Sequence, residues 1–549
     1  MNQGAATIRY GPDGKPWGET VSPLAKFQGT YLVSPPSVDP ASLYDFKEEP
    51  ITSAWYQVPS TGLTREQRTR AFDETEKAFH SSENVMLGYR RSLRNGLECV
   101  SGQFMSAHLN NGGSAYGASH NGLTTLWMER NVLDYFACLW NAKWPHNPKD
   151  PKSYWGYTLT MGSTEGNLHA LWNARNYLSG KYSVEESKSV LSSYHYSQCI
   201  LPVGNPNAFS PVVFYSQEVH YSFTKATEAL AIPSFYEIGS QKYPSECPLG
   251  GDWPLAVPCE GGDGGSGIID IEALKILVDF FSAKGHPIIV IFSYGTTAKG
   301  AYDDVKTAGE ALVPILKKNN MYERKHYYLD DPDAYIIRKG FWFHVDGALG
   351  ASYAPFLQMA YQKGLTDLIP PPMFDFRLNF IASIVISGHK FIGIPWPCGI
   401  YISKTEFQLR SPTKAHVAYI ESPDLTLAGS RNAHSALALW SYISTYSYEE
   451  QARRAIEALK TALYAEQKFK ELEADIKQDL WVMHSPASLA IGFKRPNAWI
   501  LAKYHITGNS LRVKGEWRQY VYIYTIDGEV KKPKIDELIE DLRSPDAFN

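Results

Sequence analysis

One segment indicates how the chain folds: Asn379-Phe-Ile-Ala-Ser-Ile-Val-Ile386-Ser-Gly-His-Lys390-Phe-Ile-Gly393. Its apolar run is continuous rather than alternating, which is typical of a strand buried on both faces of a parallel sheet. Two similar runs lie upstream, at 286–292 and 340–345, and a helical stretch at 305–318 separates them. The pattern predicts an α/β fold whose central, mostly parallel sheet is covered by helices on both faces.

Open sheets of this kind bind ligands at the carboxyl ends of their strands, so the residues that follow each run are candidates for function. Lys390 follows the third run, where burial would lower its pKa and let it form a Schiff base with a carbonyl. A surface lysine is the alternative. Asp346 follows the second run and needs a partner if it is buried. It would act as a helix cap or turn former ahead of Gly347, or as the counter-ion of a protonated ring nitrogen.

A third candidate is the segment Thr160-Met-Gly-Ser-Thr-Glu-Gly-Asn167, which opens a predicted helix over 168–178. Its small residues allow close approach, Ser163 and Thr164 supply hydroxyls, and a helix start supplies free amides and a positive dipole end. The segment is either an anion cradle or a plain capped helix start. An anion site, a carboxylate for a ring nitrogen and an amine for an aldehyde together fit pyridoxal phosphate.

On these residues the chain resembles the group II pyridoxal-phosphate-dependent amino acid decarboxylases, from about residue 105 to 440. The nearest branch is the histidine-decarboxylase-like one, which includes decarboxylases of aliphatic and sulfur-containing amino acids. The resemblance implies the aspartate-aminotransferase-like fold (fold type I) and pyridoxal 5'-phosphate as the cofactor. It also implies an enzyme that releases CO2 from an L-amino acid and leaves the primary amine.

The resemblance also implies roles for single residues. Lys390 would hold the cofactor as a Schiff base, Asp346 would pair with the ring nitrogen, and His220 would stack on the ring. A helix-start core histidine is the alternative for His220. Further positions match the groups that contact the cofactor in the family: Ser163, Thr164, Thr296, Ser387 and His389.

Two more positions lie beyond Lys390. Tyr419 matches a tyrosine on a mobile loop that reprotonates the substrate carbon, and relatives with phenylalanine there tend toward oxidative aldehyde formation. An exposed loop tyrosine is the alternative. Ser430 matches the serine of a Gly-Ser-Arg segment that reaches the phosphate in a neighbouring subunit. The resemblance therefore implies a homodimer with active sites at the interface.

The substrate is harder to predict. Relatives often read Asn-Asn-x-Gly-Asp-Pro where this chain has Ser114 and Ala115 in the last two places, which speaks against histidine. Many aromatic residues and the step Pro395-Trp396-Pro397 favour a medium-sized apolar amino acid such as methionine, leucine or valine. An aromatic amino acid or histidine is the alternative substrate. Oxidative aldehyde formation, carbon–sulfur lyase action and a catalytically inactive binding protein are the alternative functions.

The chain is expected to have three parts: an N-terminal arm at 1–110, a large cofactor-binding domain at 111–430 and a small α+β domain at 431–549. The first 80 residues are rich in Pro, Gly, Ser and Tyr and suggest an irregular arm. Farther along, a long amphipathic helix is predicted at 449–474 and strands at 480–484 and 520–526.

Composition excludes several other classes of protein. The 549 residues include 53 basic and 57 acidic side chains, so nothing points to nucleic acid or an anionic membrane as a partner. No apolar run reaches the length of a membrane span, and the start shows no secretory signal, so a cytoplasmic location is expected. The six cysteines form no CxxC pair and predict no metal site, although Cys247 and Cys259 could pair if oxidised.

Overall fold

The computed structural model describes residues 62–89, 92, 104, 106–117, 124–188, 191–408 and 424–548. The chain divides into two compact units, Met1–Met86 and Leu87–Asn549. In the described part of the chain no helix combines the length and the apolar character needed to cross a bilayer.

The first unit contains one described helix, α2 (Arg65–Val85). The expectation of an irregular arm is therefore wrong for residues 65–80. The sequence argument relied on apolar periodicity, which is weak in this mostly charged helix. Its start is set by a capping box instead: Thr64 Oγ1 accepts from the Gln67 amide at 3.2 Å, and Gln67 Oε1 accepts from the Thr64 amide at 2.8 Å.

The second unit is built on a six-stranded sheet with the order β1-β10-β9-β8-β5-β4. The strands are β1 (Tyr154–Leu159), β4 (Val212–Phe214), β5 (Ile288–Ser293), β8 (Phe341–Asp346), β9 (Ile381–Ser387) and β10 (Gly399–Lys404). Strands β4, β5, β8 and β9 are parallel to one another, and β10 runs antiparallel to both β9 and β1. The predicted mostly parallel sheet is confirmed, and its three quoted runs form β5, β8 and β9.

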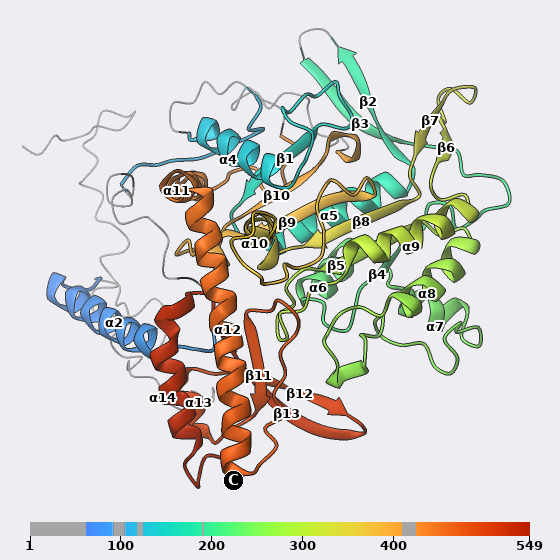
Figure 1. Ribbon diagram of the computed structural model, residues 1–549. Helices are drawn as coiled ribbons and strands as arrows, with labels where there is room; N and C mark the ends of the chain where they lie inside the picture. Colours follow the sequence, from blue (N-terminus) through green and yellow to red (C-terminus); the bar gives the residue numbers. More distant parts are fainter. Residues whose placement is uncertain are drawn as a thin grey trace, which may run out of the picture. The chain divides into compact units, whose positions relative to one another are not determined.

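Helices cover both faces of this sheet (Figure 1). Along β5, Val290 packs in one apolar cluster with Leu277 of α8 (Ile271–Ala283) and Leu312 of α9 (Val305–Lys318). The next residue, Ile291, packs in a second cluster with residues of α5 (Ser163–Leu178) and α6 (Ser222–Leu230). Because neighbouring strand residues point to opposite faces, a continuous apolar strand fills two cores at once.

A smaller three-stranded antiparallel sheet follows in the order β11 (Ala490–Lys494), β13 (Glu516–Tyr524) and β12 (Gly508–Val513). Strand β13 corresponds to the run expected at 520–526. The strand expected at 480–484 is wrong, because only Met483 pairs there, in an isolated bridge with Gly492. Long helix α12 (Tyr448–Ile476) confirms the expected helix, and α13 (Ala498–Tyr504) and α14 (Lys532–Leu542) accompany this sheet.

The remaining elements surround the central sheet. They are the helices α4 (Leu126–Leu139), α7 (Phe235–Lys242), α10 (Ala354–Gln362) and α11 (Ala433–Thr445), and the hairpins β2–β3 (Lys181–Lys188, Leu191–Gln198) and β6–β7 (Arg324–Tyr327, Tyr335–Arg338). Cys247 and Cys259 are both free thiols in this arrangement.

Candidate active site

A cavity of about 390 Å³ lies at the carboxyl ends of the parallel strands. It is lined by residues that follow β5, β8 and β9 and by residues at the starts of α5 and α6. This is the place where an open α/β sheet binds its ligand. The cavity brings together eight of the residues singled out in the sequence: Ser163, Thr164, His220, Thr296, Asp346, Ser387, His389 and Lys390.

One end of the cavity is suited to an anion. Helix α5 starts there, after Gly162 at a positive φ of 69°. A Cβ at Gly162 would lie 2.5 Å from the His389 ring, so glycine alone fits this approach. The Ser163 amide donates to Ser387 Oγ at 3.1 Å, and the two hydroxyls are 2.9 Å apart. Exposed Thr164 completes a cluster of hydroxyls at the positive end of a helix.

Asp346 lies buried at the end of β8. Its carboxylate accepts from Asn167 Nδ2 at 3.1 Å and from the Ala348 amide at 3.2 Å. Within the described residues it forms no ion pair. A buried carboxylate without a cation is costly. Asp346 is therefore suited to a ligand that brings a positive charge into the cavity.

His220 precedes α6 and is half-buried beside the cavity. Its Nδ1 accepts from the Ser222 amide at 3.2 Å and lies 2.8 Å from Ser222 Oγ. These two contacts hold the imidazole from one side. The ring is thus fixed in orientation at the edge of the space in which a ligand would lie.

Lys390 follows β9 in a single π-helical turn, Gly388–Ile392, within which its own backbone is not helical. Such turns occur frequently at functional sites. The half-buried Lys390 is the one lysine among the described residues that lines the cavity. Neighbouring His389 also lines it, and burial together with the charge of Lys390 lowers the pKa of His389.

The turn after β5 closes another side of the cavity. Gly295 has a positive φ of 95°. The amides of Gly295 and Thr296 both donate to the Ala301 carbonyl at 2.9 Å, and the Ala301 amide donates back to Thr296 Oγ1 at 3.0 Å. Thr296 is therefore part of a rigid turn that presents its side chain at the cavity.

Tyr419 lies outside the described residues, and its role stays a prediction. One described candidate, Ser430, is not brought to the cavity. Ser430 is exposed and does not line the cavity, and its Oγ accepts from Asn110 Nδ2 at 3.3 Å. The segments around Ser430 and Asn111, both noted in the sequence, pair with each other: the Asn111 amide donates to the Arg431 carbonyl at 3.0 Å, and the Arg431 amide donates to Asn110 Oδ1 at 3.0 Å.

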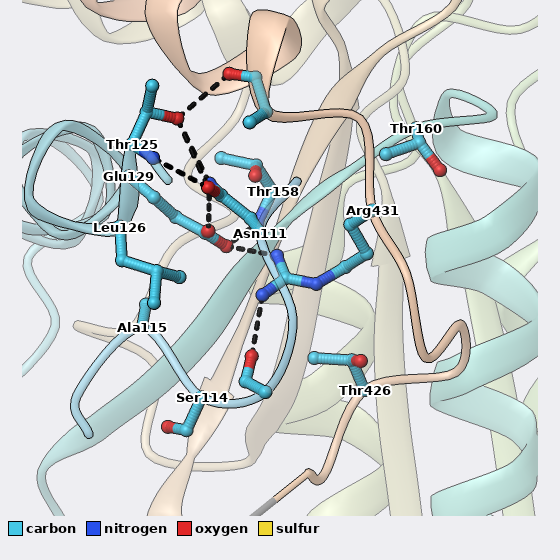
Figure 2. Close-up of polar contacts among 12 residues, drawn as sticks. Asn111, Ser114, Ala115, Thr125, Leu126, Glu129, Thr158, Thr160, Thr426 and Arg431 are labelled. Carbon is cyan, nitrogen blue, oxygen red and sulfur yellow. Dashed lines mark hydrogen bonds and ion pairs between the residues drawn. The ribbon is translucent and has the colours of Figure 1, made fainter. Parts of the chain in front are cut away.

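A fully buried ion pair between Arg431 and Glu129 of α4 anchors these two segments (Figure 2). The Glu129 carboxylate also accepts from Asn111 Nδ2 at 2.9 Å and from the Thr158 amide at 2.9 Å. Arg431 Nη1 makes the contact with Glu129, and Arg431 Nη2 donates to the Gly113 carbonyl at 2.6 Å. The pair thus joins α4, β1 and two loops that are far apart in the sequence.

We expect Arg431→Met to destabilise the protein by about 3–5 kcal/mol, because it leaves the Glu129 charge buried and unpaired. The change is measured as the free energy of unfolding in urea. The matched control is Arg453→Met, which breaks an exposed pair with Glu457 on α12 and should cost less than about 1 kcal/mol. Equal losses in the two variants would contradict the role given to the buried pair.

Several cavity residues were not anticipated from the sequence: Tyr89, Met161, Asn167, Glu218, Tyr221, Ser293 and Ala348. Met161 and Asn167 do stand inside the segment 160–167 that was already singled out, and Glu218 stands two residues before His220, so their position was the available signal. Glu218 Oε1 forms an ion pair at 3.0 Å with the buried Lys299, whose Nζ also donates to the Asp263 carbonyl at 2.8 Å.

The residues around the cavity fit pyridoxal phosphate. The start of α5 offers backbone amides and hydroxyls for the phosphate, and the absence of a side chain at Gly162 lets the His389 ring pack against this helix start. Asp346 is a buried acceptor that forms no ion pair with any described residue, which suits it to a protonated ring nitrogen. Lys390 is an amine at the same cavity for the aldehyde.

Comparisons with known proteins agree with this site. Residues 264–479 match the family model of the pyridoxal-dependent decarboxylase conserved domain. The crystal structure of L-methionine decarboxylase from Streptomyces sp.590 is 38% identical, with a TM-score of 0.82 over 90% of this chain and 98% of that one. Histidine decarboxylase of Vibrio campbellii is 27% identical over 440 residues, which are 80% of this chain and 85% of that protein. Serine decarboxylase 3 of Oryza sativa subsp. japonica is 28% identical over 395 residues, which are 72% of this chain and 66% of that protein.

The central sheet has the fold type I arrangement and carries this cavity. L-methionine decarboxylase is 38% identical to this chain over 98% of its own length. Together these findings assign the family. The chain belongs to the group II pyridoxal-phosphate-dependent decarboxylases, in the histidine-decarboxylase-like branch, and it is an amino acid decarboxylase, a carboxy-lyase that uses pyridoxal phosphate.

Proposed function

We propose that this decarboxylase acts on a medium-sized apolar L-amino acid, with methionine first and leucine or valine next. The products are CO2 and the corresponding primary amine. The observation that carries the proposal is the 38% identity with L-methionine decarboxylase over 98% of that chain, against 27% and 28% with the histidine and serine decarboxylases.

The lining of the cavity supports an uncharged substrate side chain. Met161 and Pro397 add apolar surface, and Tyr89 and Tyr221 add aromatic surface. The carboxylate of Glu218 is already engaged with Lys299. Among the described residues of the lining, an imidazolium or ammonium side chain would thus find no uncommitted carboxylate except Asp346, which the cofactor takes.

The proposed roles of the cavity residues follow their positions. Lys390 Nζ holds the cofactor and yields it to the amine of the substrate. Asp346 holds a proton on the ring nitrogen, and His220 packs on the face of the ring. The phosphate is bound by the hydroxyls and amides at the start of α5 and beyond β9: Ser163, Thr164, Ser387 and His389, with Thr296 at the neighbouring turn.

Bound pyridoxal phosphate supplies a conjugated, cationic ring that takes up the electron pair left on Cα when the carboxylate departs as CO2. The protein residues then have two tasks. Asp346 keeps the ring nitrogen protonated, which makes the ring a better electron acceptor. Tyr419, directly or through His220, would deliver a proton to Cα in place of the lost carboxylate, and Lys390 would be the amine that holds the cofactor between turnovers.

We further propose that the enzyme is a homodimer in which Ser430 of one subunit contacts the phosphate in the other. The exposed position of Ser430, away from the cavity of its own chain, supports this. We expect light scattering to give twice the monomer mass of 61.6 kDa, and a monomer at micromolar concentration would contradict the proposal. We also propose a cytoplasmic location and a division of the chain into an N-terminal arm at 1–110, a cofactor-binding domain at 111–430 and a small domain at 431–549.

The test of the substrate is a panel of twenty amino acids assayed for release of CO2 by the purified holoenzyme. We expect kcat/KM for methionine to exceed that for histidine, serine and glutamate by about 100-fold or more, because a polar side chain in an apolar pocket loses its hydration without gaining a partner. A preference for histidine or an aromatic amino acid would overturn the apolar assignment and leave the decarboxylase itself intact.

The alternatives on the same fold differ in their products. Oxidative aldehyde formation consumes oxygen and yields an aldehyde, ammonia and peroxide, and a carbon–sulfur lyase yields a thiol. We expect the primary amine in a one-to-one ratio with CO2. Tyrosine rather than phenylalanine at 419 supports this, since the family resemblance associates phenylalanine there with aldehyde formation.

A further inference from the structure

One buried amide connects the residues proposed for the two sides of the cofactor ring. Asn167, in the second turn of α5, lines the cavity but has no part in the roles given above. Its Nδ2 donates to Asp346 Oδ2 and to Ser222 Oγ, both at 3.1 Å, and its Oδ1 lies 3.0 Å from His344 Nε2. Both amide hydrogens and the amide oxygen are thereby engaged by three residues.

The groups at the two ends of this hydrogen-bond network indicate which atom donates in each bond. Trp342 Nε1 can only donate, and it donates to Ser383 Oγ at 3.2 Å. The Ser383 hydroxyl then donates to His344 Nδ1 at 2.8 Å. Burial lowers the pKa of His344 to about 4, so the ring is neutral at physiological pH and its one proton, on Nε2, goes to Asn167 Oδ1. The amide must therefore turn its Nδ2 toward Asp346, which only accepts.

A branch of the same network reaches His220. The Nδ1 of His220 accepts a hydrogen bond from the backbone amide of Ser222, which can only donate. Because Ser222 Oγ accepts from Asn167, its own hydrogen is free to point at the same Nδ1, 2.8 Å away. A neutral His220 consequently carries its proton on Nε2, the nitrogen on the other side of the ring.

We propose that Asn167 is a positioning residue that orients the Asp346 carboxylate and, by directing the Ser222 hydroxyl at Nδ1 of His220, reinforces the tautomer that the Ser222 amide already favours. The proposal rests on the roles proposed above for Asp346 and His220. Without the amide, Asp346 keeps the Ala348 amide as its hydrogen-bond donor in the described part of the chain. Ser222 and His344 lose a partner at the same time, so both sides of the ring are affected by one side chain.

Two variants of Asn167 test this through cofactor binding, measured as the dissociation constant of pyridoxal phosphate from the apoprotein across a range of pH. Asn167→Leu removes the donor without adding charge. We expect it to weaken cofactor affinity by about 10- to 100-fold at every pH, the equivalent of a hydrogen bond to a charged group, and to lower kcat with little change in KM.

Asn167→Asp should behave differently. It places a second carboxyl against Asp346, and two carboxyls in contact share a proton because one pKa of the pair rises. At low pH the protonated side chain donates as the amide does, so affinity approaches that of the wild type and falls as pH rises. The other titratable groups around the cavity are common to the wild type and the variant: Tyr89, Glu218, His220, Tyr221, His389 and Lys390 in its lining, and His344 of β8 against the side chain at 167. The difference between the two pH profiles therefore isolates the pair.

Asn173 provides the matched control. It lies on the same helix and is also buried, but it does not line the cavity. Its Nδ2 donates to Gln408 Oε1 at 3.2 Å and lies 2.8 Å from His169 Nε2. We expect Asn173→Leu and Asn173→Asp to lower the Tm with cofactor affinity and its pH profile unchanged. The inference is overturned if the Asn167 variants show this same pattern.

Ser222→Ala separates the two branches. It breaks the link to His220 and leaves the bond to Asp346, so we expect a lower kcat with near-normal cofactor affinity. Unchanged kcat and KM would overturn the His220 branch. If Asp346→Asn and His220→Ala alter neither cofactor binding nor turnover, the proposed function itself fails. If those two variants are impaired and the Asn167 variants are not, only this inference fails.

Discussion

Lys390→Ala is expected to lower kcat by about 10⁴-fold or more and to remove the absorbance of the cofactor–lysine Schiff base, because the residue is proposed to hold the cofactor through that bond. Within the described residues no other lysine lines the cavity, so no neighbour is placed to take over its role. The measurement is CO2 release with saturating pyridoxal phosphate, together with an absorbance spectrum of the dialysed protein.

Lys404→Ala is the control for this experiment. Lys404 also ends a strand of the central sheet, and burial lowers its pKa to about 7, so it is a second reactive amine in the same sheet. Its Nζ donates to the Asn379 carbonyl at 2.7 Å, and it does not line the cavity. We expect activity close to that of the wild type. Release of CO2 at the wild-type rate by Lys390→Ala would refute the assignment of Lys390.

The second large effect is expected for Asp346→Asn, which keeps the shape of the side chain and removes its charge. The ring nitrogen then loses the anion that keeps it protonated. Breaking a buried charge pair costs about 3–5 kcal/mol, which corresponds to a loss of about 10²- to 10⁴-fold in kcat. Cofactor affinity should fall as well, since the same pair contributes to binding.

Both quantities are measured on one preparation, kcat by CO2 release and affinity by titration of the apoprotein. Asp375→Asn is the control, because Asp375 is an equally buried carboxylate whose partner is Arg377, at 2.8 Å, and it does not line the cavity. It should lower stability without changing cofactor affinity. An Asp346→Asn protein with normal kcat would show that the ring nitrogen does not depend on this carboxylate.

Local sequence patterns were sufficient for the strands that carry the site. Continuous apolar runs identified β5, β8 and β9, and Asp346 and Lys390 stand out because a charged residue at the end of such a run is costly. The small residues of segment 160–167 indicated a helix start, although α5 begins at Ser163 rather than at the predicted 168. These features depend on neighbours within about ten residues, which is the range over which periodicity and capping act.

The same local patterns failed where a segment lacks apolar periodicity or depends on distant partners. Charged α2 was missed, although Thr64 and Gln67 form a capping box that the sequence does display. Residues 480–484 have the composition of a strand, yet only Met483 found a pairing partner. Whether an apolar run becomes a strand depends on which edge of a sheet is left open, and that is a property of the assembled fold.

The sequence by itself therefore determined the kind of sheet, the ends of the strands where chemistry occurs, and the residue types available there. Only the tertiary structure decided which of them meet. Arg431 pairs with Glu129 across 302 positions, and Asn167 joins Asp346, 179 positions away, to Ser222. The reason is that the path of the chain, rather than the local pattern, decides which buried polar groups meet, and each such group needs a partner because water is excluded.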